Sequence, residues 1–316
     1  MTLRYLMQRV GSLILVLFGV SLLTFAIIPL IPGSPARVRL GVQATPESVA
    51  AVERQLGLDR PLPVQYVDWL GGIVLHGDFG ESLITGTPIS GEVARRLPAT
   101  LALAFTALLF GLLIALPSGI ISALKPGGRR DLTVSLMSQI GVSVPDFWMG
   151  ILMILLFAET LDWLPSSGYV PLAQGFLPWL SHILLPAATV GIISGSIMAR
   201  FVRGAMLEVL RNDYVRTARA KGLREGAILV KHVLRNAAIS VVTIVGLQMA
   251  TLFSAVVVVE IIFAWPGLGS MALNATLQRD YPLLQAAVLS AAGAFVIINL
   301  LTDLSYVLLD PSVEYA

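Results

Sequence analysis

Residues 97–124 read LPATLALAFTALLFGLLIALPSGIISAL, and no side chain in this stretch is charged. About 20 apolar residues in an α-helix cross the hydrocarbon core of a bilayer, which is about 30 Å thick. Backbone groups in lipid must be hydrogen-bonded within the protein, and a helix achieves this within one segment. The stretch therefore predicts a transmembrane helix from Leu97 to Leu124.

The composition extends this interpretation to the rest of the chain. Of its 316 residues, 56% are hydrophobic and 13% are charged, and the mean hydropathy is +0.83. A soluble domain carries about 25% charged residues, so this composition excludes a soluble enzyme, a disordered protein and a collagen-like fibre. The sequence has no cysteine, which excludes disulfides, thiolate metal sites and a cysteine nucleophile. A net charge of only +2 does not indicate nucleic-acid binding.

Six apolar segments have the length of transmembrane helices, so we expect an all-α integral membrane protein with six spans. The segments are Val10–Ile31, Leu97–Leu124, Leu132–Phe157, Ile183–Ala199, Ala237–Val259 and Tyr281–Thr302. The third is interrupted at Pro145-Asp146, and the fourth is short and rich in glycine. The first segment is too long for the apolar core of a signal peptide, and no small-residue cleavage pattern follows it. We therefore expect it to be retained.

Basic residues are distributed unevenly around these segments. They precede the first segment, follow the second, and are most frequent after the fourth: Arg4 and Arg9; Lys125, Arg129 and Arg130; then Arg200, Arg203, Arg211, Arg216, Arg219, Lys221, Arg224, Lys231 and Arg235. The connection of residues 159–182 has none. Because cytoplasmic loops carry the excess of lysine and arginine, both termini and the loop of residues 200–236 are predicted to be cytoplasmic. The long connection from Pro32 to Arg96 is then external.

The first connection also carries local signals. Thr45 can cap a helix that has Pro46 in its first turn, and Gly57 would end that helix. Tyr66 and Trp69 are candidates for the lipid interface, where aromatic residues gather.

Motifs of catalysis are absent from the sequence. It contains no G-x-x-x-x-G-K-[ST], no H-E-x-x-H and no G-x-S-x-G pattern, so we predict no nucleotide site of the P-loop type and no catalytic residues. The three histidines, His76, His182 and His232, lack the spacing of metal ligands. No metal site is expected.

Three acids lie at the depth of the membrane, and one of them, Asp303, closes the sixth apolar segment near a helix end. Glu260 ends the fifth apolar segment, and a place near a helix end, in contact with protein or headgroups, explains it adequately. Asp146 follows Pro145, and it either caps the half-helix that starts at Phe147 or marks a transport pathway. Our candidates for a translocation path are Asp146, Phe147, Gln248 and Glu260. Gly191, Gly195 and Gly246 fit close helix packing better than a path.

The loop of residues 200–236 contains the sequence DYVRTARAKGL at 213–223. Asn212 or Asp213 can cap a helix at its N-terminus, and Gly222 can end it in a left-handed turn. The stretch predicts a short cationic helix, followed by a second helix from about Glu225 to Arg235. From the residues alone, the first helix either contacts anionic lipid or docks into a groove of a partner protein.

This stretch resembles the coupling segment of ABC-importer permeases, and more closely the B-type subunit of dipeptide and oligopeptide importers. The superfamily pattern is E-A-A-x-x-x-G, and alignment on Gly222 places Arg216-Thr217-Ala218 at the E-A-A positions, without the glutamate. YVRTARAKGL is typical of the peptide subclass, and His232 to Ala237 continue the match. Further stretches that resemble the family, in order, are Gly77–Ser82, Leu97–Leu101, Ala264–Gly269 and Arg279–Leu283. Ser240 stands where these permeases usually have proline.

The resemblance implies a type I ABC-importer permease fold in a bacterial cytoplasmic membrane. Residues 1–94 would hold the first transmembrane helix and the external loop, and residues 95–316 a five-helix transmembrane domain with the coupling loop 200–236. The partners would be a homologous second permease subunit, two ATPase subunits that carry ATP and Mg²⁺, and an external substrate-binding protein. The chain itself would be no enzyme and would hold no cofactor.

The resemblance also implies roles for individual residues. Coupling to the ATPase would involve Asp213, Tyr214, Arg216, Thr217, Ala218, Arg219, Lys221, Gly222 and His232. The external mouth would include Asp78, Phe79, Trp265, Pro266 and Arg279. Family substrates are dipeptides, longer peptides, glutathione and nickel complexes, and selectivity resides largely in the binding protein. The alternatives are an ion-coupled secondary transporter, which usually has coupling carboxylates at the membrane midplane, and a purely structural membrane scaffold.

Overall fold

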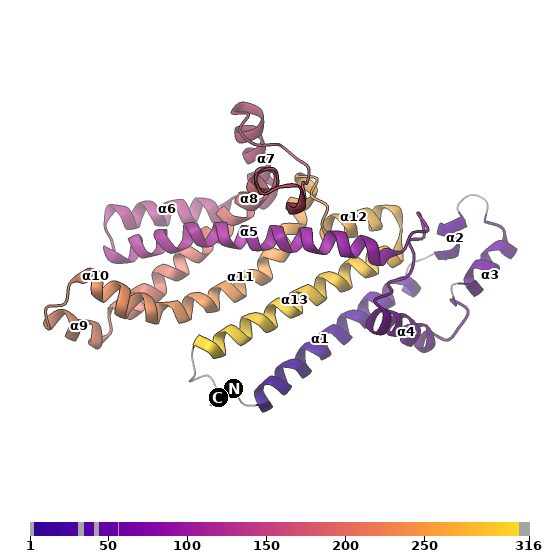
Figure 1. The fold of residues 1–316 in the computed structure, drawn as a ribbon, viewed down its shortest axis with the longest axis horizontal. Coiled ribbons are helices and arrows are strands. Elements are labelled where there is room, and N and C mark those ends of the chain that lie inside the picture. The colour runs from indigo at the N-terminus through magenta and orange to yellow at the C-terminus, as the bar shows by residue number, and fades with distance from the viewer. Residues whose placement is uncertain (1–2, 31–34, 41–43, 56, 310–316) are drawn as a thin grey trace. The chain divides into compact units, whose positions relative to one another are not determined.

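The computed structural model describes residues 3–30, 35–40, 44–55 and 57–309. Regular structure in these ranges is helical, apart from one isolated bridge between Glu81 and Pro88, which confirms the all-α class. The elements in chain order (Figure 1) are α1 (Leu3–Leu30), α2 (Pro35–Leu40), α3 (Pro46–Gln55), α4 (Leu62–Gly71), η2 (Gly72–His76), α5 (Ile89–Leu124), α6 (Arg129–Ser143), α7 (Asp146–Met153), η3 (Ile154–Thr160), η4 (Leu172–Gln174), α8 (Phe176–Leu210), α9 (Asp213–Ala220), α10 (Glu225–Ile228), η5 (Leu229–Leu234), α11 (Arg235–Ile262), α12 (Leu268–Gln278) and α13 (Tyr281–Leu309).

Five helical segments in the described chain are long and apolar enough to cross a membrane. They are Met7–Pro29, Ile89–Leu124, Phe176–Leu210, Glu225–Met249 and Tyr281–Thr302. The pair formed by α6 and α7–η3 passes the same test together, with a bend of 103° at the break. The described residues therefore hold five continuous candidate spans and one broken candidate, in agreement with the six expected segments.

The helices extend beyond the apolar runs that predicted them. α5 begins at Ile89, and α8 continues well past the expected end at Ala199. The expected boundary was wrong because hydropathy falls at Arg200, whereas the backbone hydrogen bonds of a helix do not depend on side-chain polarity. The first part of the expected 200–236 loop is thus the end of α8. α11 is continuous through Ser240.

The chain divides into two compact units. Unit 1 comprises residues 1–5, 101–265 and 298–316, and unit 2 comprises residues 6–100 and 266–297. In unit 1, α8 packs against α6, α7 and α11.

α5 and α8 approach each other closely in unit 1. Both carry small residues at every fourth position, which are Ala107, Gly111, Ala115 and Gly119 on α5 and Gly191, Gly195 and Ala199 on α8. A methyl group on Gly195 would lie 2.8 Å from the backbone oxygen of Gly111, and one on Gly191 would lie 2.9 Å from that of Ala107. The small residues therefore set the distance between the two backbones, which confirms the packing role expected for Gly191 and Gly195.

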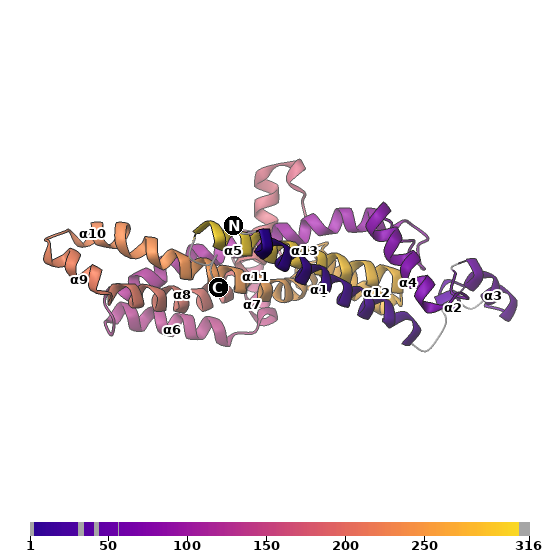
Figure 2. The ribbon, with the colours of Figure 1, turned by 90° about the horizontal axis from the view of Figure 1, so that it is seen from below.

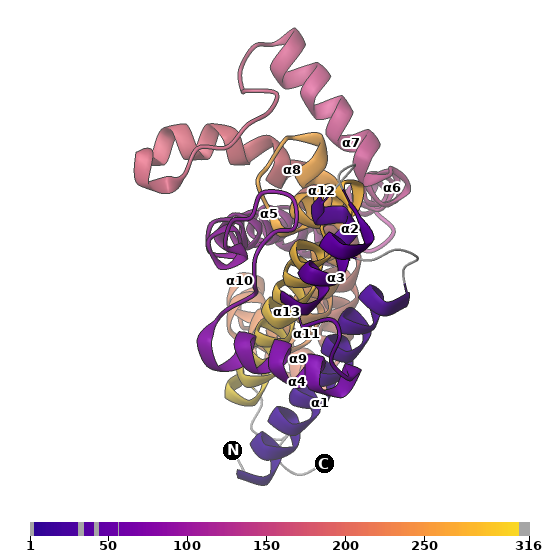
Figure 3. The same cartoon turned by 90° about the vertical axis from the view of Figure 1, so that its right-hand side faces the viewer.

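The break in the third apolar segment lies where Pro145 predicted it. Val144 is extended (φ −86°, ψ 125°), as a residue before proline prefers, and α7 begins after the proline. Figure 3 shows α7 turned away from α6. Asp146 does not cap α7, because Pro145 occupies the N-cap position and no side chain bonds there. The expected cap was wrong by one position, since Asp146 is itself the first helical residue.

In unit 2, the beginnings of α5 and α13 pack around α12. Their shared apolar cluster consists of Ile89, Val93, Leu268, Met271, Ala286 and Ala287. α1 joins α13 through Gln285, whose Nε2 donates to the backbone oxygen of Thr24 at 3.2 Å. The helix expected after Thr45 is α3, and the Ser48 N–H donates to Thr45 Oγ1 at 3.2 Å. Gly57, expected to end this helix, follows it and has a left-handed conformation, with φ +67°.

We predict that Gly195→Ala destabilises the protein. The added methyl group meets the Gly111 carbonyl oxygen, which cannot move without the backbone of α5. Overpacking of this kind costs about 1–3 kcal/mol, so the midpoint of thermal unfolding in detergent should fall. Gly204→Ala on the same helix is the matched control, because nothing lies within 4 Å of its added methyl group and alanine favours helices. Equal midpoints for Gly195→Ala and the unmodified protein would contradict the close packing.

Candidate functional site

The predicted coupling stretch forms α9, which lies with α10 beyond the ends of α8 and α11 in unit 1 (Figures 1 and 2). Its end is fixed by Gly222, which has φ +79° in the left-handed region that favours glycine. The Leu223 N–H donates to the Ala218 carbonyl at 3.3 Å, and the Gly222 N–H donates to the Arg219 carbonyl at 2.9 Å. These two bonds are a Schellman motif, and they confirm the expected stop at Gly222.

The start of α9 differs in detail from the prediction. Asn212 occupies the N-cap position, but its side chain makes no capping hydrogen bond. Asp213 is the first helical residue, and its carboxylate lies at the positive end of the helix dipole. It accepts a long hydrogen bond of 3.5 Å from Arg216, and its carbonyl accepts from the Thr217 hydroxyl at 2.9 Å.

α9 has one buried face and one exposed face. Val215 and Ala218 are buried on an apolar cluster that includes Met206 of α8, Ile228 of α10 and Val233 of η5. The exposed residues include Asp213, Tyr214, Arg216, Thr217, Arg219, Lys221 and Gly222. The buried face attaches α9 to three neighbouring elements of its own chain. Ala218, expected as a coupling residue, belongs to this face.

A cavity of about 440 Å³ lies beside α9. Its lining comes from the end of α5 and the turn after it (Ala123, Leu124, Pro126), from the end of α8 and the residue after it (Leu207, Leu210, Arg211), and from Arg219, Glu225, Gly226, Ile228 and Leu229. Arg219 and Glu225 form an ion pair at this cavity, with 2.8 Å between Nε and Oε1. The pair ties the end of α9 to the beginning of α10.

The second short helix expected from Glu225 to Arg235 is not a separate element. α10, η5 and α11 follow one another without a break from Glu225 to Ile262, and η5 is a π-helical stretch within this run. No proline interrupts the run, so the helix continues. His232 is half-buried in η5, and its carbonyl accepts from Asn236 Nδ2 at 2.6 Å.

A buried carboxylate joins three helices at this end of unit 1. Asp131, near the start of α6, accepts from Arg203 of α8 through Nε at 2.7 Å and Nη2 at 2.8 Å. The Ser122 hydroxyl of α5 donates to the same carboxylate, as does the Gly127 N–H at 2.8 Å. Four donors thus compensate the burial of Asp131, and they fix the α5–α6 turn against α8.

Sequence reasoning missed this network. Arg203 was grouped with the basic loop, and Asp131 stood beside Arg129 and Arg130 without a distinguishing pattern. The only available signal was a lone acid at the edge of an apolar segment, because residues that lie far apart in sequence give no local pattern.

The residues expected at the external mouth are divided between the two units. Asp78, Phe79, Pro266 and Arg279 belong to unit 2, and Trp265 to unit 1. Asp78 is exposed, and its Oδ1 accepts from the Gly80 N–H at 2.8 Å. Phe79 is half-buried against the apolar cluster of unit 2. Arg279 is exposed and left-handed (φ +58°) at the end of α12.

Trp265 is fully buried. Its ring meets that of Tyr169 edge-to-face, with 4.7 Å between centroids, and the Gly168 N–H donates to the Phe263 carbonyl at 2.9 Å. The indole therefore holds the 168–169 segment against the end of α11.

Two of the motifs singled out in the sequence meet in unit 2. Asp280, which precedes α13 and is almost fully buried, accepts from the Ser82 hydroxyl and from the Leu83 N–H at 3.2 Å. Within the loop, the Ser82 N–H donates to the Thr87 carbonyl at 3.0 Å. Both motifs were noted in the sequence, but nothing in the sequence indicated that they contact each other. The contact fixes the base of an exposed turn at residues 84–87.

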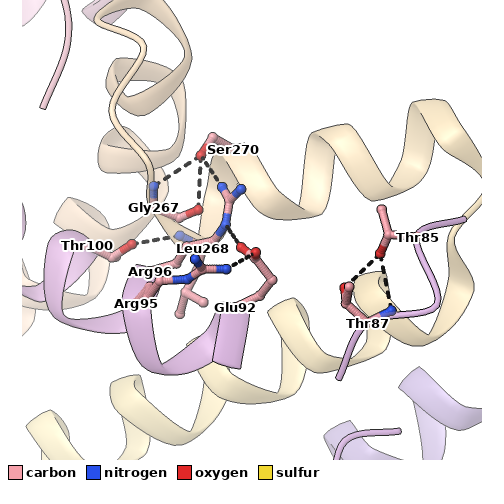
Figure 4. A network of polar contacts seen from close by, with 9 residues as sticks. All are labelled: Thr85, Thr87, Glu92, Arg95, Arg96, Thr100, Gly267, Leu268 and Ser270. Carbon is pink, nitrogen blue, oxygen red and sulfur yellow. Dashed lines mark hydrogen bonds and ion pairs between the residues drawn. The ribbon is translucent and has the colours of Figure 1, made fainter. Parts of the chain in front are cut away.

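Figure 4 shows how the beginning of α5 also fixes the beginning of α12. The Leu268 N–H, one of the unpaired donors at a helix start, donates to Thr100 Oγ1 at 2.8 Å. Arg96 pairs with Glu92 at 2.9 Å and reaches Ser270 Oγ at 3.5 Å. Unit 2 therefore has a polar framework around its exposed loops.

The four candidate path residues differ in their exposure. Asp146 is partly exposed and Phe147 is 52% exposed, whereas Gln248 and Glu260 are buried in α11. None of the four lines the cavity beside α9. Among the described residues, no group of three or more His, Cys, Asp or Glu side chains has the geometry of a metal site.

Comparison with known families shows which family this chain belongs to. Residues 115–315 match the family described as binding-protein-dependent transport system inner membrane component, and residues 2–104 match the N-terminal family of the same membrane components. The chain belongs to this permease family. It is thereby a multi-pass protein of the bacterial inner membrane, as the resemblance implied.

Relatives of the permease match it over nearly its whole length. A di/tripeptide transport system permease, DppB of Pseudomonas aeruginosa, is 41% identical over 99% of both chains. A probable peptide ABC transporter permease of Sinorhizobium fredii is 39% identical over 98% of this chain and 99% of its own. The oligopeptide permease AppB of Bacillus subtilis is 37% identical over 98% and 99%. These matches confirm the resemblance to peptide-importer permeases and give no support to a secondary transporter.

Solved structures support the fold of the permease. An inward-facing MetNI methionine ABC transporter has a chain with a TM-score of 0.59 and 20% identity, which covers 70% of this chain and 97% of its own. A second crystal form of MetNI gives a TM-score of 0.58 at 22% identity, over 69% and 96%. At these identities the likeness concerns the fold, which is that of ABC-importer membrane subunits.

We predict that Asp131→Asn destabilises the permease by about 3 kcal/mol, because it leaves the Arg203 guanidinium without its buried counter-charge. The measurement is thermal unfolding in detergent. Asp213→Asn is the matched control, since its pair with Arg216 is exposed and such pairs contribute about 0–1 kcal/mol. Similar small changes for both variants would show that the Asp131 network does not hold the helix ends together.

We predict that Asp280→Ala frees the turn at residues 84–87, because Ser82 and Leu83 lose their common acceptor. The cysteine-free sequence allows a nitroxide label at Thr85→Cys, and its spectrum should change from ordered to mobile. Glu81→Gln is the control, because its ion pair with Arg39 is long (3.6 Å) and partly exposed. An unchanged spectrum in Asp280→Ala would refute the anchor.

Proposed function

We propose that this permease is the membrane-spanning subunit of an ATP-driven importer of peptides, and that α9 couples ATP hydrolysis on partner subunits to transport. The observation that carries the proposal is the exposed face of α9, on a helix whose other face and whose end are fixed to its own chain. Relatives named as peptide, di/tripeptide and oligopeptide permeases support the substrate class.

α9 has the properties of a coupling element. Tyr214, Arg216 and Thr217 offer an aromatic ring, a cation and a hydroxyl to a groove on an ATPase subunit. Because Val215 and Ala218 pack on α8, α10 and η5, a displacement of α9 moves those elements with it. Such rigid-body movement would switch the permease between two states. ATP and Mg²⁺ would be bound by two ATPase subunits, and this chain would hold neither.

The remaining partners follow from the same proposal. A homologous second permease subunit would complete the translocation path, and an external binding protein would deliver the peptide. Both termini and α9 would be cytoplasmic. Residues 1–94 would form the first span and external loop, and residues 95–316 the five-helix transmembrane domain.

The residues of the proposed mouth and of the proposed path would have different roles. Asp78, Phe79, Pro266 and Arg279 would contact the binding protein, whereas Trp265 would act indirectly by holding Tyr169. Asp146 and Phe147 would face the path in the state described. Gln248 and Glu260 are buried, so they would join the path only after α11 rearranges.

The test is a substitution at the end of α9 in the reconstituted transporter. Gly222→Val places a β-branched residue at φ +79°, a conformation that costs an L-residue about 1–2 kcal/mol. We expect loss of peptide uptake in proteoliposomes, together with loss of the stimulation of ATPase activity by the loaded binding protein. Gly226→Ala is the matched control, because nothing lies within 4 Å of its added methyl group and its backbone is not left-handed.

Normal uptake and normal ATPase stimulation in Gly222→Val would refute the coupling role. A second variant, Arg216→Glu, keeps the backbone unchanged and reverses one exposed charge. It should weaken copurification of the ATPase subunits if α9 docks on them.

A further inference from the structure

α4 packs against α1 through aromatic side chains in unit 2. Tyr66 meets Phe18 and Phe25 edge-to-face, with 6.2 and 5.4 Å between ring centroids, and Trp69 lies 5.7 Å from Phe25. The Tyr66 hydroxyl is within 2.7 Å of Ser21 Oγ. Figure 3 shows α4 lying across α1 rather than along it.

The level of this contact along α1 can be placed in the membrane. The apolar span of α1 is Met7–Pro29, and a helix rises 1.5 Å per residue. Phe25 therefore lies about 6 Å inside the Pro29 end of the span, Ser21 about 12 Å and Phe18 about 16 Å inside it. Half of the hydrocarbon core is about 15 Å thick. α4 thus meets α1 at the level of one lipid leaflet.

The two flanks of α4 differ in polarity. With 3.6 residues per turn and Tyr66 and Trp69 turned to α1, Gln65 and Asp68 lie on one flank, and Val67 and Leu70 lie on the other. Asp68 pairs with Arg60 at 3.0 Å, and Gln65 Nε2 donates to the backbone oxygens of Leu58 and Arg60. A helix with one polar and one apolar flank is typical of helices that lie in the membrane plane.

Apolar side chains of α4 and η2 are exposed in the chain. Val67, Val74 and Leu75 are 66%, 71% and 76% exposed. α1, against which α4 packs, also exposes apolar side chains along its candidate membrane span, such as Leu23 at 74%. Exposed apolar side chains thus lie on α4, on η2 and on the helix that α4 crosses.

We propose that α4 and η2, residues 62–76, form an in-plane helix embedded in the lipid leaflet at the Pro29 end of α1, with acyl chains covering Val67, Val74 and Leu75. A segment of the long first connection is then a membrane element and not part of a water-exposed loop. The proposal depends on α1 crossing the membrane and not on the transported substrate.

The experiment uses the cysteine-free chain in the assembled transporter, reconstituted in liposomes. Nitroxide labels are attached at Val67→Cys and Leu75→Cys, with Leu23→Cys on α1 as the lipid reference and Thr85→Cys in the exposed turn as the water reference. Collision with oxygen, which concentrates in lipid, and with a water-soluble nickel chelate is measured for each label. We expect Val67→Cys and Leu75→Cys to match Leu23→Cys, with frequent oxygen collisions and loss of nickel collisions.

Two results would overturn the proposal. Nickel collisions at the level of Thr85→Cys would place α4 in water. Few collisions with either reagent would show that a protein surface covers the apolar flank. The labelled side chains are exposed, so the substitutions are not expected to disturb folding, and peptide uptake by each variant checks this directly.

Discussion

The close contact between α5 and α8 is the constraint on which the rest of unit 1 depends. Small residues at four-residue intervals on both helices bring the backbones together, and a methyl group on Gly195 would meet the Gly111 carbonyl oxygen at 2.8 Å. In a membrane, where lipid is as apolar as the helix surface, such packing replaces the hydrophobic driving force of soluble proteins. Because α8 also packs against α6, α7 and α11, its position relative to α5 sets the positions of the other helices.

α8 also connects this packed region to the end of unit 1 where α9 lies. Arg203 of α8 fixes the turn between α5 and α6 through Asp131, and Met206 of α8 lies beneath Val215 of α9. The Schellman motif at Gly222 and the pair between Arg219 and Glu225 then connect α9 to α10, which continues into α11. A short helix held at so many points can transmit a displacement instead of absorbing it, which is what a coupling element requires.

Local signals allowed much of this fold to be predicted from the sequence. Apolar runs located the spans, Pro145 located the break between α6 and α7, and Gly222 located the end of α9. Helix limits were less predictable, because α8 runs past Arg200 into a polar stretch. Contacts between distant residues were not predictable at all: Asp131 with Arg203 and Ser82 with Asp280 have no pattern in a single sequence. The burial of single residues was not predictable either, since Trp265 and Ala218 face their own chain.

The central claim is that the exposed face of α9 lies against an ATP-binding subunit in the working transporter. Photo-cross-linking tests it most directly, with benzoylphenylalanine in place of Tyr214 and, as a control, in place of Leu277 on the exposed side of α12. After irradiation of membranes, the account predicts an adduct between the Tyr214 position and a subunit that contains a P-loop, and no such adduct from Leu277. Adducts of the Tyr214 position with lipid alone would contradict the account.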